Sequence, residues 1–179
     1  MDDPRAWYHV ILTTYGAWLY GDPRGFRTRH HRERVEGDDK HPPPPGIYAR
    51  RARRSRELLK QPPVVIPFAL RALVGQSLRH ERTRLGAWVL VIAVGGQHVH
   101  LLVKMPAGRP RDWIGRAKKH ATDRLRAEAW QGRLWGVRRK ALRIRDREHQ
   151  RNVFHYILAH AADGAWTGVW KNEPKREGE

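Results

Sequence analysis

Residues 95–105, GGQHVHLLVKM, decide the fold, because two glycines separate one apolar run from the next. The preceding run, WVLVIAV at 88–94, is continuously apolar and typical of a central β-strand. Gly95 and Gly96 favour a tight turn between antiparallel strands. The sequence therefore predicts a β-hairpin in the middle of the chain.

The second strand of this hairpin carries two histidines. His98 and His100 are two residues apart, so they project from the same face, while Val99 and Leu101 point to the other. Two imidazoles on a rigid strand supply half of a metal site, because the backbone fixes their separation. With 11 histidines in 179 residues, chance alone supplies on the order of one such pair, so a surface pair without a ligand remains an alternative.

The segments around the hairpin alternate between strand and helix patterns. The predicted elements are a strand at 7–14, a helix at 67–84, the two hairpin strands, a helix at 111–129, a strand at 134–145 and a helix at 147–162. Asp146 is placed to cap the last helix. This order predicts an α+β fold with a ferredoxin-like antiparallel sheet and helices packed on it.

The predicted domain organisation is one domain at 1–165 followed by a polar, charged tail at 166–179. A basic, proline-rich insertion at about 28–63 interrupts the domain and includes four consecutive prolines at 42–45. It is either a solvated linker or an arm that grips the DNA backbone.

The charge balance points to a polyanionic partner. Lys and Arg number 36 against 18 Asp and Glu, which gives a formal net charge of +18, and nucleic acid is the first candidate. Because the chain has no cysteine, disulfides, thiolate metal sites and cysteine nucleophiles are excluded. The longest uncharged apolar stretch, 86–96, is too short to span a bilayer, and the first residues lack a signal-peptide pattern. We therefore expect a cytoplasmic protein without a membrane partner.

The segment NVFHYILAH at 152–160 offers a nucleophile and a third ligand. On a helix, Tyr156 and His160 are four residues apart and share a face. The alternative is that Tyr156 lies at the rim of the core with its hydroxyl in water, which is a common role for tyrosine.

The HVHLLV strand after an apolar hairpin, the basic helix, the LW…RIRD strand and the closing helix with YI together resemble the HUH-superfamily single-tyrosine transposases. That family includes insertion-sequence and REP-associated tyrosine transposases. The resemblance implies an HUH endonuclease-type fold and a transposase that cleaves and joins single-stranded or hairpin DNA. The implied route is a metal-assisted 5′-phosphotyrosine intermediate.

The resemblance also implies roles for individual residues. Tyr156 becomes the catalytic nucleophile, and His98, His100 and His160 become ligands of a divalent metal, Mg²⁺ or Mn²⁺. His160 stands where the family more often has Gln or Asn, and the insertion at 28–63 is absent from compact members. Four cations on the basic helix are the predicted DNA-binding residues: Arg116, Lys118, Lys119 and Arg124.

Other functions stay open on the sequence alone. A non-catalytic, domesticated protein that binds nucleic-acid hairpins explains the charge equally well. A replication initiator or relaxase would use the same chemistry, and a hydrolytic zinc enzyme would use the histidines without an obvious carboxylate base. The target DNA, and whether the chain acts as a monomer or a homodimer, cannot be read from the sequence.

Overall fold

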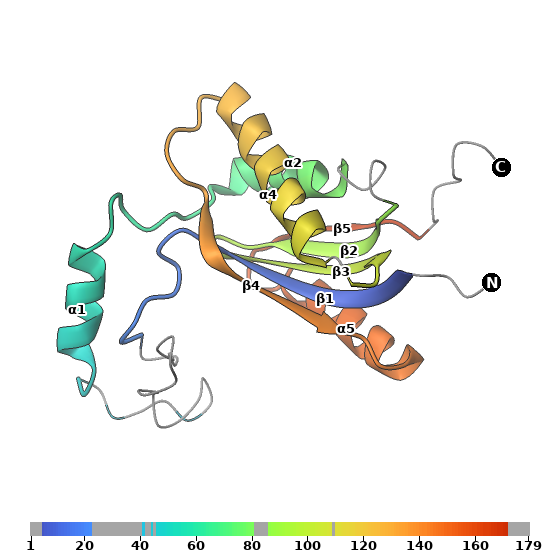
Figure 1. Cartoon of the computed structure of the whole chain (residues 1–179), viewed down its shortest axis with the longest axis horizontal. Helices are drawn as coiled ribbons and strands as arrows, with labels where there is room; N and C mark the ends of the chain where they lie inside the picture. Colours follow the sequence, from blue (N-terminus) through green and yellow to red (C-terminus); the bar gives the residue numbers. More distant parts are fainter. Residues whose placement is uncertain are drawn as a thin grey trace.

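A computed structural model of the chain describes residues 5–22, 41, 44, 46–80, 86–108 and 110–171. Its elements follow in the order β1 (Arg5–Thr14), α1 (Ala49–Glu57), α2 (Phe68–His80), β2 (Trp88–Val94), β3 (His98–Pro106), α4 (Pro110–Ala127), β4 (Trp135–Arg143), α5 (Arg147–Ala159) and β5 (Trp166–Val169) (Figure 1).

The strands form one sheet in the order β4-β1-β3-β2-β5. Every pair of neighbours is antiparallel. The segment from β1 through α2, β2, β3 and α4 to β4 has the element order and strand order of a ferredoxin-like fold. The predicted fold class is therefore confirmed, and α5 and β5 are additions to it.

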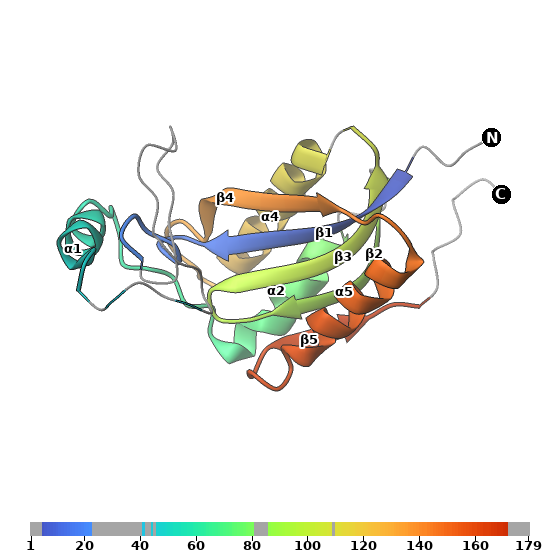
Figure 2. The same cartoon turned by 90° about the horizontal axis from the view of Figure 1, so that it is seen from below.

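Helices cover both faces of the sheet (Figures 1 and 2). The larger core lies under α2 and α4 and includes Leu12, Leu101 and Ile114. The smaller core lies under α5 and includes Leu102 and Ile157. Because side chains alternate along a strand, successive residues of β3 enter opposite cores. The two faces of the molecule that carry candidate functional residues are separated by this sheet.

The bounds of α5 follow from its caps. The Asp146 Oδ1 accepts a hydrogen bond from the backbone N–H of His149 at 2.7 Å, which confirms the predicted cap. The helix ends at Ala159, three residues before the predicted end, and the chain then turns through Gly164 at a φ of +75°. The ordered turn after α5 brings the chain back to the sheet as β5.

Two elements lie where the sequence predicted none. Trp166–Val169, assigned above to the polar tail, pairs with β2 as an edge strand. Ala49–Glu57, within the predicted insertion, forms α1, in which Ala52 is the buried residue. The insertion residues 28–40, 42, 43 and 45, and residues 81–84 of the helix predicted at 67–84, lie outside the described part of the chain. None of the described helices is long and apolar enough to cross a membrane.

Candidate active site

Three histidines meet between β3 and α5. His98 and His100 project from β3 on the face that α5 covers, and His160 is the C-cap of α5. One ring nitrogen from each of the three lies within 4.8 Å of the others. The structure thus gathers all three histidines that the sequence analysis assigned to a metal site.

The burial of His160 and the surroundings of its two ring nitrogens fit a metal ligand. Its side chain is 15% exposed, and its Nδ1 lies 3.6 Å from an Asp163 carboxylate oxygen. Its other ring nitrogen, Nε2, is buried and has no hydrogen-bond partner among the described residues. A buried ring nitrogen without a partner costs free energy, so such an atom calls for a ligand or a bound ion. A carboxylate on the far nitrogen is the usual support for a metal-binding imidazole.

A fourth histidine, His9 of β1, belongs to the same cluster and was missed at the level of sequence. His9 pairs with Leu102 and His100 pairs with Ile11, so the two histidines are diagonal neighbours on one face of the sheet. The Nε2 of His9 lies 3.0 Å from the Nδ1 of His100, and the two nitrogens share a hydrogen bond. The alternation of WYHVILTT could have located it, because this pattern puts His9 on the other face of the strand from Tyr8 and Val10.

Burial keeps the imidazoles of His9 and His100 uncharged. It lowers the pKa of His100 to about 3, with further lowering from the neighbouring His160, His9 and His98. It also lowers the pKa of His9 to about 4, aided by His149 and His160. At neutral pH both rings therefore keep a free lone pair for a hydrogen bond or an ion.

Tyr156 stands beside this cluster with its side chain 50% exposed. Its ring centroid lies 4.9 Å from that of His160, 5.5 Å from that of His100 and 5.8 Å from that of His9. A rim tyrosine would be exposed in the same way, but a rim position alone does not predict three imidazole neighbours. The arrangement places an accessible phenol next to the uncharged rings of His9 and His100.

The four predicted DNA-binding residues lie on α4, on the opposite side of the sheet from Tyr156 (Figure 1). Arg116, Lys119 and Arg124 are exposed. Lys118 is partly buried and its Nζ donates to the Gly136 carbonyl at 2.7 Å. Burial lowers the pKa of Lys118 to about 8, with the charges of Arg139 and Arg133 adding to the effect.

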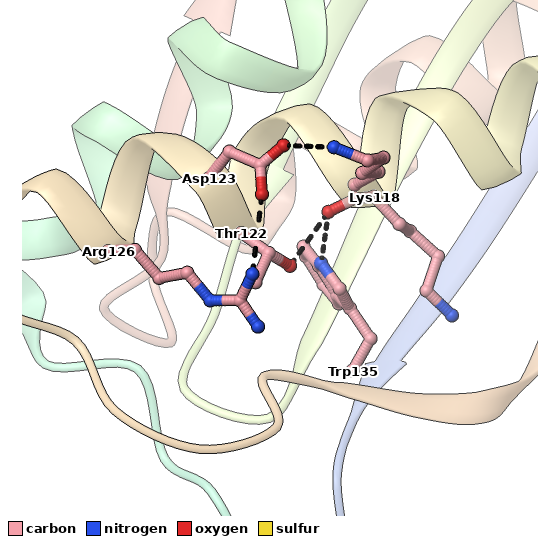
Figure 3. A network of polar contacts seen from close by, with 6 residues as sticks. Lys118, Thr122, Asp123, Arg126 and Trp135 are labelled. Carbon is pink, nitrogen blue, oxygen red and sulfur yellow. Dashed lines mark hydrogen bonds and ion pairs between the residues drawn. The ribbon is translucent and has the colours of Figure 1, made fainter.

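Lys118 and Lys119 line an open cleft of about 440 Å³ between α4 and the start of β4. Arg126 and Arg133 line it as well, whereas Arg116 and Arg124 do not. Figure 3 shows its wall: the Lys118 carbonyl accepts hydrogen bonds from Thr122 and Trp135, at 2.9 Å each. Asp123 pairs with Lys119 at 2.6 Å and Arg126 at 3.5 Å. The cleft is a basic surface that presents cations from α4 and from the loop before β4.

A second basic surface is α1, and the segment that follows this helix contacts the rim of the cleft. Gln61 donates to the Arg133 carbonyl and accepts from the Arg133 N–H, both at 2.8 Å. On α1 itself, Ser55 donates to the Tyr20 carbonyl at 2.8 Å. Four arginines of this helix are exposed: Arg50, Arg53, Arg54 and Arg56. Figure 2 places α1 at the end of the sheet where β1 ends and β4 begins.

Comparison with known proteins gave a match at the level of structure. No protein-family model matches the chain, and no curated protein sequence matches it. Among solved structures, the chain is similar to a REP-associated tyrosine transposase bound to a REP hairpin, with a TM-score of 0.49 and 13% identity over 89% of this chain and 68% of that one.

Proposed function

We propose that this protein is a transposase-type enzyme that cleaves and joins single-stranded or hairpin DNA through Tyr156. One observation carries the proposal: an exposed tyrosine contacts His100 and His160, and the Nε2 of His160 is buried with no hydrogen-bond partner among the described residues. A tyrosine nucleophile beside a nitrogen ligand set is the arrangement that metal-assisted phosphoryl transfer needs.

His98, His100 and His160 would hold the divalent ion, Mn²⁺ or Mg²⁺. Three imidazoles form a softer donor set than carboxylates, which favours Mn²⁺ over Mg²⁺. A bound ion supplies positive charge to the non-bridging oxygens of the scissile phosphate.

In the proposed covalent step, Tyr156 attacks the scissile phosphate. The phenol oxygen of Tyr156 forms a bond to phosphorus, and the bond from phosphorus to the 3′-oxygen breaks. The phenol proton passes to solvent, and the departing 3′-oxygen takes up a proton from solvent to become a hydroxyl. The product is a 5′-phosphotyrosine, which keeps the free energy of the phosphodiester. A 3′-hydroxyl of a second strand can therefore reverse the attack and join two ends without ATP.

The basic surfaces would hold the DNA while Tyr156 acts. Lys118 and Lys119 in the cleft, together with Arg116 and Arg124 elsewhere on α4, are the proposed phosphate contacts. The exposed arginines of α1 extend this surface at the end of the sheet where His98 begins β3.

The test is covalent capture of DNA. The protein is incubated with a pool of single-stranded hairpin oligonucleotides and Mn²⁺ or Mg²⁺, and a labelled protein–DNA adduct is sought on a denaturing gel. We expect an adduct that disappears with EDTA and in Tyr156→Phe. Tyr20→Phe, at an exposed tyrosine outside the histidine cluster, is the matched control and should keep the adduct.

A second function is favoured by one observation, the separation of the basic cleft from Tyr156 by the sheet. A non-catalytic hairpin-binding protein needs the cleft but not the tyrosine. It would retard hairpins on a native gel and give no adduct with any metal. Tyr156→Phe would then bind hairpins as tightly as the wild type.

A further inference from the structure

His9 has no part in the chemistry proposed above, yet it contacts both a proposed metal ligand, His100, and the proposed nucleophile, Tyr156. Its ring nitrogen shares a hydrogen bond with a ring nitrogen of His100. Its ring also lies edge-on to that of Tyr156, at a centroid distance of 5.8 Å and an interplanar angle of 70°. His9 is itself buried, at 7% exposure, so its position is fixed by packing.

The hydrogen bond restricts how His100 can bind an ion. A neutral imidazole has one nitrogen that carries a proton and one that offers a lone pair. The Nδ1 of His100 is engaged by His9, so Nε2 is the nitrogen left for an ion. For Nε2 to offer its lone pair, the proton of His100 must be on Nδ1, and His9 must accept it.

We propose that His9 is a positioning residue: its Nε2 accepts a hydrogen bond from the Nδ1–H of His100 and thereby holds His100 in the tautomer that binds metal through Nε2. This inference rests on the proposed function, because it assigns the support of that metal site. The packing of His9 against the Tyr156 ring gives the same residue a second effect, which is to limit where the nucleophile can lie.

A merely structural role makes a different prediction. If His9 only fills space in the small core under α5, an apolar residue of similar volume should serve as well. If the acceptor atom matters, Gln should serve, because its side-chain oxygen can occupy about the position of the His9 Nε2. The pair His9→Leu and His9→Gln therefore separates volume from hydrogen bonding. His155→Gln, at an exposed histidine of α5, is the control for loss of an imidazole.

The first measurement is nitrogen NMR of the imidazoles in the metal-free protein at neutral pH. We expect His100 to carry its proton on Nδ1 in the wild type and in His9→Gln. In His9→Leu we expect the proton on Nε2, because the acceptor for Nδ1 is gone. This readout needs neither DNA nor metal.

The second measurement is the dissociation constant for Mn²⁺ by titration calorimetry. His9→Leu should weaken binding by about 10- to 100-fold, as loss of a supporting hydrogen bond to a metal ligand does. His9→Gln should stay within roughly threefold of the wild type, and His155→Gln should match it.

The outcomes separate this inference from the proposed function. A wild type that binds no Mn²⁺ overturns the proposed metal site, while the tautomer of His100 still decides the role of His9. A wild-type His100 protonated on Nε2, or Mn²⁺ binding by His9→Leu equal to the wild type, overturns the positioning role. Should His9→Leu fail to fold, the wild-type tautomer and the behaviour of His9→Gln still test the positioning role.

Discussion

His160 carries the most specific prediction for a single residue. Because its Nε2 is buried and has no partner among the described residues, we expect His160→Ala to remove a ligand and not a structural bond. Affinity for Mn²⁺ should fall by about 100-fold, while Asp163→Asn should cost less than about tenfold because Asp163 is 81% exposed. Calorimetric titration of the folded variants checks both values. Equal affinity in His160→Ala and the wild type would exclude His160 from the site.

The lowered pKa of Lys118 leads us to expect that DNA binding depends on pH. Because its pKa is lowered to about 8, the side chain is charged at pH 7 and largely neutral at pH 9 in the free protein. Affinity for hairpin DNA should therefore fall by roughly threefold to tenfold over that interval, at constant salt. Lys118→Arg stays charged throughout, so its affinity should be nearly constant with pH. A wild type whose affinity is as constant as that of the variant would mean that Lys118 does not contact phosphate.

Single residues also show what sequence can and cannot locate. Spacing places His98 and His100 on one face of a strand, and the resemblance links them to Tyr156 and His160. The partner of His100 could not be found in this way, because His9 meets it only through the register of β1 on β3. Likewise Arg133 joins the basic cleft because a loop folds back onto α4, which no local period reports.

At the scale of elements, the contact between α2 and β5 depends on a glycine. A Cβ built at Gly75 would overlap the ring of Trp166, so Gly75→Ala should destabilise the protein by about 1–3 kcal/mol. Gly115 of α4 has open space around it, and Gly115→Ala should stabilise by about 0.5–1 kcal/mol through helix propensity. Chemical denaturation midpoints compare the two. A Gly75→Ala variant as stable as the wild type would show that Trp166 can move aside without cost.

The helix α1 yields a prediction about salt. If its four exposed arginines contact phosphates, changing Arg50, Arg53, Arg54 and Arg56 together to Gln should reduce the slope of log affinity against log salt by about 3. The same four changed to Lys keep the charge and should keep the slope. Both Gln and Lys are good helix formers, so the helix is retained. Hairpin affinities at several salt concentrations provide the slopes, and a Gln variant with the wild-type slope would remove α1 from the DNA-binding surface.

The elements that the sequence predicted share one property, which is either a continuous run of apolar residues or apolar residues that recur at a regular spacing. β2 has the predicted bounds. β1 begins two residues before its predicted start and ends where predicted, and β4 and α4 differ from their predicted bounds by one or two residues at each end. β5 is only four residues long, which is too short for an alternation of apolar and polar residues to be recognised in the sequence. α1 has a single buried residue, so it carries no apolar stripe, and its fixed position comes from tertiary hydrogen bonds such as that of Ser55.

At the scale of the whole molecule, an ion in the histidine cluster would bind α5 to the sheet. A ligand that binds only the folded state stabilises it by about 2.7 kcal/mol when present at 100 times its dissociation constant. For a chain of 179 residues this corresponds to an increase of several degrees in Tm. Thermal unfolding with and without Mn²⁺ measures the increase, and His98→Ala should abolish most of it. A wild-type Tm that does not change when Mn²⁺ is added would contradict the proposed metal site.

The position of β1 in the sheet has a consequence for synthesis. β1 lies between β3 and β4, so Val10 pairs with Leu101 on one side and with Ala141 on the other. Contacts between such distant parts of a chain form slowly, and they cannot form before the later strands are made. The histidine cluster needs β1, β3 and α5 together, whereas the positive charge of the chain needs no folding. A chain still being translated therefore attracts polyanions well before it has assembled the site that would act on them.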